Sequence, residues 1–84
     1  MTSGADAKLL AVFEDWRRVK GMTHNAFARW LERDVVEWAH ARKGRRRVPR
    51  AMVALALQKA DAEAPLWVAR INNAIAEDAL ARVS

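Results

Sequence analysis

The chain has 84 residues, with 15 basic and 10 acidic side chains, a formal net charge of +5, and no cysteine. This length suits a single small domain, and the lack of cysteine excludes both a disulfide framework and a thiolate metal site. The positive charge favours a polyanionic partner, nucleic acid before acidic protein or anionic lipid.

The positive charge is concentrated in the first part of the chain. Residues 1–60 carry 13 basic and 6 acidic side chains, whereas residues 61–84 carry 2 basic and 4 acidic ones. The apolar runs are short and the first residues are small and polar, so we expect neither a membrane span nor a secretory signal. We therefore expect a cytoplasmic protein.

In chain order, residues 1–6 have no apolar pattern and are expected to form a flexible N-terminus. Residues 7–20 have the apolar stripe of a surface helix, which ends at Gly21. The stripe consists of Leu9, Val12, Phe13, Trp16 and Val19. We expect Phe13 and Trp16 to form a core with the aromatic residues Phe27, Trp30 and Trp38 of the following segment.

Residues 22–49 read as two short helices joined by a tight turn and followed by a run of arginines. Thr23 suits the N-cap of the first helix, and Asp34 suits the N-cap of a second helix over residues 35–43, which Gly44 ends. Two helices with so short a connection must cross at a steep angle.

This segment resembles the Cro/lambda-repressor-like (Xre-type) helix-turn-helix regulators, and the resemblance extends over residues 8–60. It rests on Met22, Thr23, Ala28, Arg29, Leu31, Asp34, Gly44 and Pro49. The resemblance implies an all-α bundle of about five helices in which the second short helix enters the DNA major groove.

Three residues depart from the family pattern. His24 stands where a glutamine is usual, Glu32 replaces a turn glycine, and Arg33 replaces an apolar turn residue. Without glycine, the turn must hold a left-handed residue or adopt another shape, at a cost of about 1 kcal/mol or more.

The outward face of the second short helix carries the candidate base-reading residues, because Trp38 and Ala41 are expected to face the core. These candidates are Val35, Val36, Glu37, Ala39, His40 and Lys43. Valine can pack on a thymine methyl group, and His40 can bond to guanine or phosphate. Two alternatives stay open: Glu37 either accepts from cytosine or orients an arginine, and Val35 or Val36 is partly core.

Six of the nine residues from 42 to 50 are basic. Beside a recognition helix, such a run is expected to contact phosphate, although a charge run can also be only a solvated loop. The predicted phosphate-binding residues are Thr23, His24, Arg29, Arg42, Arg45, Arg46, Arg47 and Arg50.

Pro49 begins a helix that runs to about Ala60 and completes a DNA-binding core over residues 7–60. After a break at residues 61–65, a last helix over residues 66–83 has more apolar surface than one packed face uses. We therefore predict a homodimer whose interface contains Trp67, Val68, Ile71, Ile75 and Ala79. The alternative is that this face packs on the protein's own core.

No pattern for catalysis, a metal or a cofactor appears, because the two serines lie at the ends of the chain and the two histidines stand apart from carboxylate clusters. No small-molecule substrate is evident either. The resemblance implies a repressor of phage, plasmid or other mobile-element origin, bound to an inverted-repeat operator that overlaps a promoter. The alternatives are an antitoxin or small inhibitor that binds an acidic protein or RNA, and a non-specific nucleoid binder.

Overall fold

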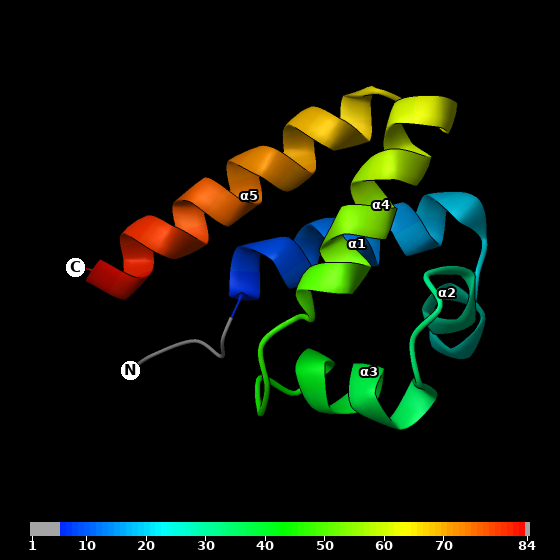
Figure 1. Ribbon diagram of the computed structural model, residues 1–84, viewed down its shortest axis with the longest axis horizontal. Helices are drawn as coiled ribbons and strands as arrows, with labels where there is room; N and C mark the ends of the chain where they lie inside the picture. Colours follow the sequence, from blue (N-terminus) through cyan, green and yellow to red (C-terminus); the bar gives the residue numbers. More distant parts are fainter. Residues whose placement is uncertain (1–5, 84) are drawn as a thin grey trace.

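The computed structural model describes residues 6–83, which form five helices and no strand (Figure 1). In chain order they are α1 (Ala7–Lys20), α2 (His24–Trp30), α3 (Val35–Arg42), α4 (Arg50–Glu63) and α5 (Leu66–Val83). The predicted all-α class is confirmed. None of these helices has both the length and the apolar character needed to cross a membrane.

The observed helix bounds follow the predicted ones closely, except at the end of α4. This helix continues through Glu63, so the predicted break at residues 61–65 shrinks to Ala64 and Pro65. Residues 61–63 contain no helix breaker, and the proline forces only the residue before it out of the helical conformation. Helix α3 ends one residue earlier than predicted.

Local side chains set the starts of the two short helices. The hydroxyl oxygen of Thr23 accepts a hydrogen bond of 3.1 Å from the N–H of Ala26 at the start of α2. The carboxylate of Asp34 accepts one of 2.8 Å from the N–H of Val36 at the start of α3. Both residues were predicted as N-caps, and both predictions are confirmed.

The connection between α2 and α3 covers residues 31–34 and contains a strained residue. Glu32 has a φ of +56°, a left-handed conformation that costs an L-residue about 1–2 kcal/mol. The N–H of Arg33 donates to the carbonyl of Ala28 at 2.8 Å, which closes the turn. The arrangement of α2 and α3 is consistent with the predicted helix-turn-helix.

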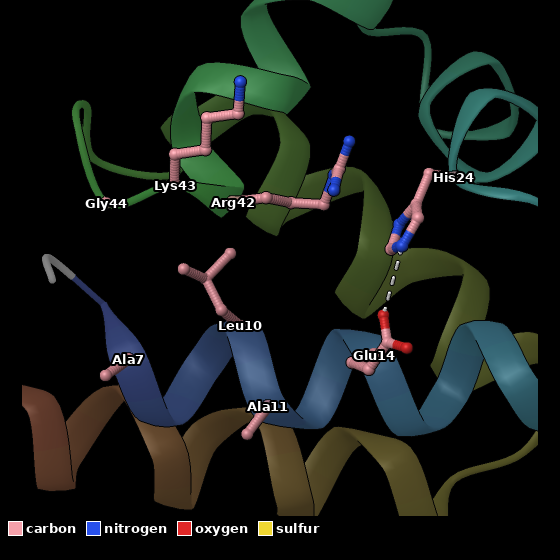
Figure 2. Close-up of a pocket in the computed structure, with 8 residues that line it drawn as sticks. All are labelled: Ala7, Leu10, Ala11, Glu14, His24, Arg42, Lys43 and Gly44. Carbon is pink, nitrogen blue, oxygen red and sulfur yellow. Dashed lines mark ion pairs between the residues drawn. The ribbon is translucent and has the colours of Figure 1, made fainter. Parts of the chain in front are cut away.

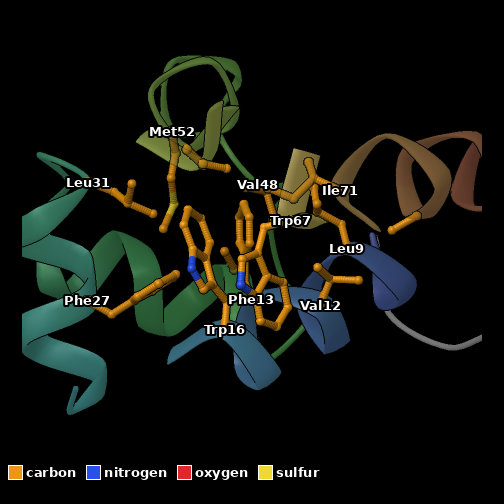
Figure 3. Close-up of a cluster of buried hydrophobic side chains, with 14 of the residues drawn as sticks. Leu9, Val12, Phe13, Trp16, Phe27, Leu31, Val48, Met52, Trp67 and Ile71 are labelled. Atoms are coloured by element: carbon orange, nitrogen blue, oxygen red, sulfur yellow. The ribbon is translucent and has the colours of Figure 1, made fainter. Parts of the chain in front are cut away.

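A cluster of aromatic side chains joins α1 to α2, α3 and α5 (Figure 3). Phe13 and Phe27 are fully buried with their ring centroids 5.8 Å apart, and Trp16 stacks on Trp67 at 5.8 Å. Trp38 is also buried. Large rings bury much apolar surface each, so a short chain can build its core around them.

Trp30 packs against the core, with its ring centroid 5.2 Å from that of Trp16, whereas Val19 lies at the surface. Trp30 is half-buried, and the ammonium groups of Lys20 and Lys59 lie 4.3 and 4.9 Å from its ring centroid. Val19 is 73% exposed, so its assignment to the core was wrong. It lies in the last turn of α1, at an edge of the apolar stripe that no other described helix covers.

Helix α5 runs antiparallel to α1 and caps it. Arg70 pairs with Asp15 at 2.7 Å, and Asp78 lies further along α5, at the amino-terminal end of α1. The buried carboxylate of Asp78 accepts hydrogen bonds of 2.9 and 3.0 Å from the N–H groups of Lys8 and Leu9. These first-turn groups have no acceptor within their own helix, so α5 supplies it.

Helix α5 also buries residues that were predicted to form a dimer interface. Trp67 and Ile71 are 7% and 0% exposed within a single chain, so their assignment to that interface was wrong. The reason is that α5 packs its apolar arc along α1. This is the alternative stated above, in which this face packs on the protein's own core. Of the other predicted interface residues, Val68 and Ile75 are half-buried and Ala79 is exposed. The large apolar side chains of α5 that remain exposed are Leu66, Leu80 and Val83.

The predicted flexible N-terminus covered residues 1–6, of which residues 1–5 lie outside the described part of the chain. For Asp6 the prediction was wrong, because this residue is 7% exposed and hydrogen-bonded. A buried carboxylate must be held by donors, and those donors fix the residue in place.

Candidate nucleic-acid interface

Helix α3 packs one face on the core and leaves the other open. Trp38 and Ala41 are 3% and 1% exposed, as expected of the inward residues. Val36, on the outward face, is 63% exposed. The buried indole therefore supports a short helix whose opposite side is free to meet a partner.

The candidate base-reading residues differ in how far they reach into solvent. Val35 is half-buried and packs against the core, so it is the valine to which the partly-core alternative applies. Val36 and Lys43 are exposed, and Ala39 and His40 are half-buried. Val36 and Lys43 are therefore the most accessible members of the set.

Glu37 lies on α3 but faces the turn before it. Its carboxylate is 3.2 Å from the Nε of Arg33, four residues earlier. This pairing is compatible with the role in which Glu37 orients an arginine. Arg33 was not predicted as a site residue, although the four-residue spacing of opposite charges is a signal that could have indicated it.

The basic segment, defined here as residues 42–50, leaves α3 and returns to the start of α4. All six of its basic side chains are exposed: Arg42, Lys43, Arg45, Arg46, Arg47 and Arg50. Gly44 turns the chain with a φ of +76°, and Val48 is 7% exposed and belongs to the core. The segment is thus a loop anchored by one apolar residue, with its cations in solvent.

Asp6 provides a second anchor for the basic segment. Its carboxylate accepts a hydrogen bond of 2.9 Å from the N–H of Val48 and lies 3.3 Å from a guanidinium nitrogen of Arg47. Arg82 of α5 lies 3.5 Å from the same carboxylate. Sequence reasoning missed this residue, because no local pattern relates Asp6 to a loop more than forty residues away.

Arg45, Arg46 and Arg50 form no ion pair within residues 6–83. Their guanidinium groups therefore keep all five N–H donors for a partner. Arg47 also keeps free donors, because Asp6 engages only part of its guanidinium group.

His24, at the start of α2, faces α1 across a groove of about 520 Å³ (Figure 2). Its Nε2 lies 3.6 Å from a carboxylate oxygen of Glu14, and Arg42 lines the same groove. Burial of the imidazole, and then the positive charge of Arg42, lower the pKa of His24. This shift favours the neutral form of the imidazole.

Glu14 remains charged at the floor of this groove. The Arg17 guanidinium, which donates to both of its carboxylate oxygens, lowers the pKa of Glu14 to about 2. The Nε2 of His24 therefore faces a carboxylate that is charged at neutral pH.

The remaining predicted phosphate contacts lie on α2. The hydroxyl of Thr23 already accepts from Ala26, and Arg29 is exposed in the last turn of the helix. Figure 1 places α2 and the basic segment at opposite ends of α3. The structure therefore gathers the cations of residues 42–50 and leaves Arg29 apart from them.

The chemistry of this surface is that of donors and cations. Guanidinium groups bind phosphate through paired N–H donors. Within residues 6–83, no three histidine or carboxylate side chains lie close enough together to hold a metal ion.

Comparisons with protein-family models, with curated proteins and with solved structures find no match to this chain.

Proposed function

We propose that this protein is a sequence-specific DNA-binding transcriptional repressor from a phage, plasmid or other mobile element. The observation that carries the proposal is the junction of α3 with the basic segment. A short helix with an exposed outward face leads directly into a loop whose six cations are all exposed. A helix of this size fits the major groove, and adjacent cations can hold the flanking phosphates.

In this proposal, Val36 packs on a thymine methyl group and His40 donates a hydrogen bond to a base or phosphate. Arg45 and Arg46 bind the backbone next to the groove. Because these two arginines are not held by carboxylates within residues 6–83, phosphate meets them without first breaking an ion pair. Base contacts then set the sequence preference, and phosphate contacts supply most of the affinity.

A homodimer extends the proposal to an inverted-repeat operator that overlaps a promoter. With Trp67 and Ile71 in the core, the surface left for a second copy is the outer arc of α5, with Leu66, Leu80 and Val83. For two copies to occupy half-sites one DNA turn apart, the dimer must hold its two α3 helices about 34 Å apart on one face. Repression would follow from occlusion of the promoter.

A footprint on the DNA immediately upstream of the protein's own gene tests the proposal. The proposal expects a protected inverted repeat at protein concentrations at least about a thousandfold below those that coat random duplex. Equal affinity for both DNAs would identify a non-specific binder. Absence of binding to either, even at low salt, would favour an acidic protein or RNA as the partner.

A further inference from the structure

A groove between α4 and α5 combines an apolar floor and walls with a cationic mouth. Its volume is about 400 Å³, within the range of small-molecule sites. In Figure 1 the two helices diverge from the turn at Ala64 and Pro65, with the start of α1 between their far ends. The apolar lining comes from three helices and the basic segment: Leu9, Val48, Val53, Ala54, Leu57 and Ile75.

Part of this lining is not covered by the protein itself. Leu9 and Val48 are buried and form the floor, whereas Val53, Leu57 and Ile75 are only half-buried. Their remaining exposed surface faces a common space, so a ligand that fills the groove would remove apolar area from three side chains at once. Such burial of apolar area is favourable.

The mouth of the groove carries three arginines from three different segments. Arg47 comes from the basic segment, Arg50 from the first turn of α4 and Arg82 from the last turn of α5. Asp6 also lines the groove, but its carboxylate already accepts from Val48 and lies against Arg47 and Arg82. The excess of positive charge is therefore centred on Arg50, which forms no ion pair within residues 6–83.

We propose that this groove binds a small carboxylic acid with an apolar tail, of the size of a medium-chain fatty acid. The tail would lie on Val53, Leu57 and Ile75, and the carboxylate would accept hydrogen bonds from Arg50 at the mouth. A guanidinium and a carboxylate match geometrically, and a charged acceptor strengthens each hydrogen bond. An uncharged apolar ligand would leave the arginine unused, and a small inorganic anion would leave the apolar walls uncovered.

The groove shares Arg47 and Arg50 with the predicted phosphate-binding set. A bound carboxylate would therefore compete with DNA phosphate for the same guanidinium groups. This consequence rests on the proposed function, whereas ligand binding itself does not. A test without DNA thus separates failure of one proposal from failure of the other.

Isothermal calorimetry with sodium octanoate on the full chain tests the site, with octanamide and butyrate as comparison ligands. Octanoate is expected to bind one to one. Octanamide should bind about tenfold more weakly or worse, because it lacks the charge. Butyrate should lose about fourfold in affinity for each methylene removed.

The variant Arg50→Gln keeps the length of the side chain and removes its charge, and Arg45→Gln is the matched control because Arg45 does not line the groove. Octanoate affinity should fall about tenfold or more in Arg50→Gln and stay unchanged in Arg45→Gln. The proposal is overturned if octanoate does not bind, if octanamide binds equally well, or if both variants lose affinity to the same extent.

Discussion

The buried carboxylate of Asp6 accepts a hydrogen bond of 2.9 Å from the backbone N–H of Val48, which lies 42 residues further along the chain. This contact ties the start of α1 to the basic segment. The contact fixes one end of this loop. The loop therefore loses less conformational entropy when its cations become ordered on a partner.

Replacing Asp6 with asparagine should therefore loosen the basic segment. An amide has one acceptor oxygen where the carboxylate has two, and its NH₂ group would face the guanidinium donors of Arg47 and Arg82. We expect the free energy of unfolding in urea to fall by about 1–3 kcal/mol, with faster hydrogen exchange at the N–H of Val48. The exposed control Asp61→Asn should change stability by less than about 0.5 kcal/mol. Equal effects of the two changes would show that the Asp6 contact adds nothing.

The strained turn offers a stabilising substitution. Glycine adopts a positive φ readily, so Glu32→Gly should relieve the left-handed strain at this position. After the larger entropy of glycine in the unfolded chain is subtracted, we expect a gain of about 0.5–1 kcal/mol in urea unfolding. Gln58→Gly, in the exposed interior of α4, should instead lose about 0.5–1 kcal/mol. A loss at both positions would mean that Glu32 is not strained.

His24 should make stability depend on pH. Its pKa is lower in the folded protein than in the unfolded chain, so the unfolded chain binds more protons between the two values. The contribution of His24 to the free energy of unfolding is therefore at its full value above about pH 6.5, and it decreases as the pH falls below that value. The groups around the ring are Glu14, Arg17 and Arg18 of α1 and Arg42 of α3.

Thermal unfolding between pH 7.5 and pH 5.5 measures this dependence. Since the pKa of Glu14 is about 2, that carboxyl does not titrate in the same window. His24→Gln should show a smaller loss of stability than the wild type across the range. A His24→Gln profile parallel to that of the wild type would contradict the effect.

The fold was largely predictable because its signals are local. Thr23 and Asp34 mark helix starts through bonds that span two or three residues, and the apolar spacing of α1 assigned Phe13 and Trp16 to the core. The caps supplied by Asp78 were not predictable, since 69 residues separate it from Leu9. Periodicity likewise identifies an apolar arc on α5, but it does not say whether α1 or a second chain covers that arc.

The candidate site was predictable in outline and less so in detail. Exposure of the cations in residues 42–50 follows from their charge, and the inward direction of Trp38 follows from helical spacing. The orientation of His24 toward Glu14 depends on how α2 packs on α1, which no short pattern in the sequence records. The same holds for the ion pair between Asp6 and Arg47.

The double variant Arg45→Ala/Arg46→Ala should weaken binding to operator and random DNA alike. Each lost phosphate contact removes about 0.9 from the slope of log affinity against log salt, so two contacts remove about 1.8. Lys8→Ala is the control, because Lys8 lines a surface groove between α1 and α5, away from α3. Titrations by fluorescence anisotropy at several salt concentrations measure both quantities. An unchanged slope would exclude these arginines from the DNA contact.

The central claim is that the exposed face of α3 reads base sequence, and the most direct test is the ratio of affinities for operator and random duplex. Val36 is 63% exposed and His40 is half-buried, so Val36→Ala/His40→Ala should leave the fold intact. We predict that this variant binds the footprinted operator about tenfold more weakly or worse, with unchanged affinity for random duplex. Equal losses on both DNAs, or no loss on the operator, would contradict the claim.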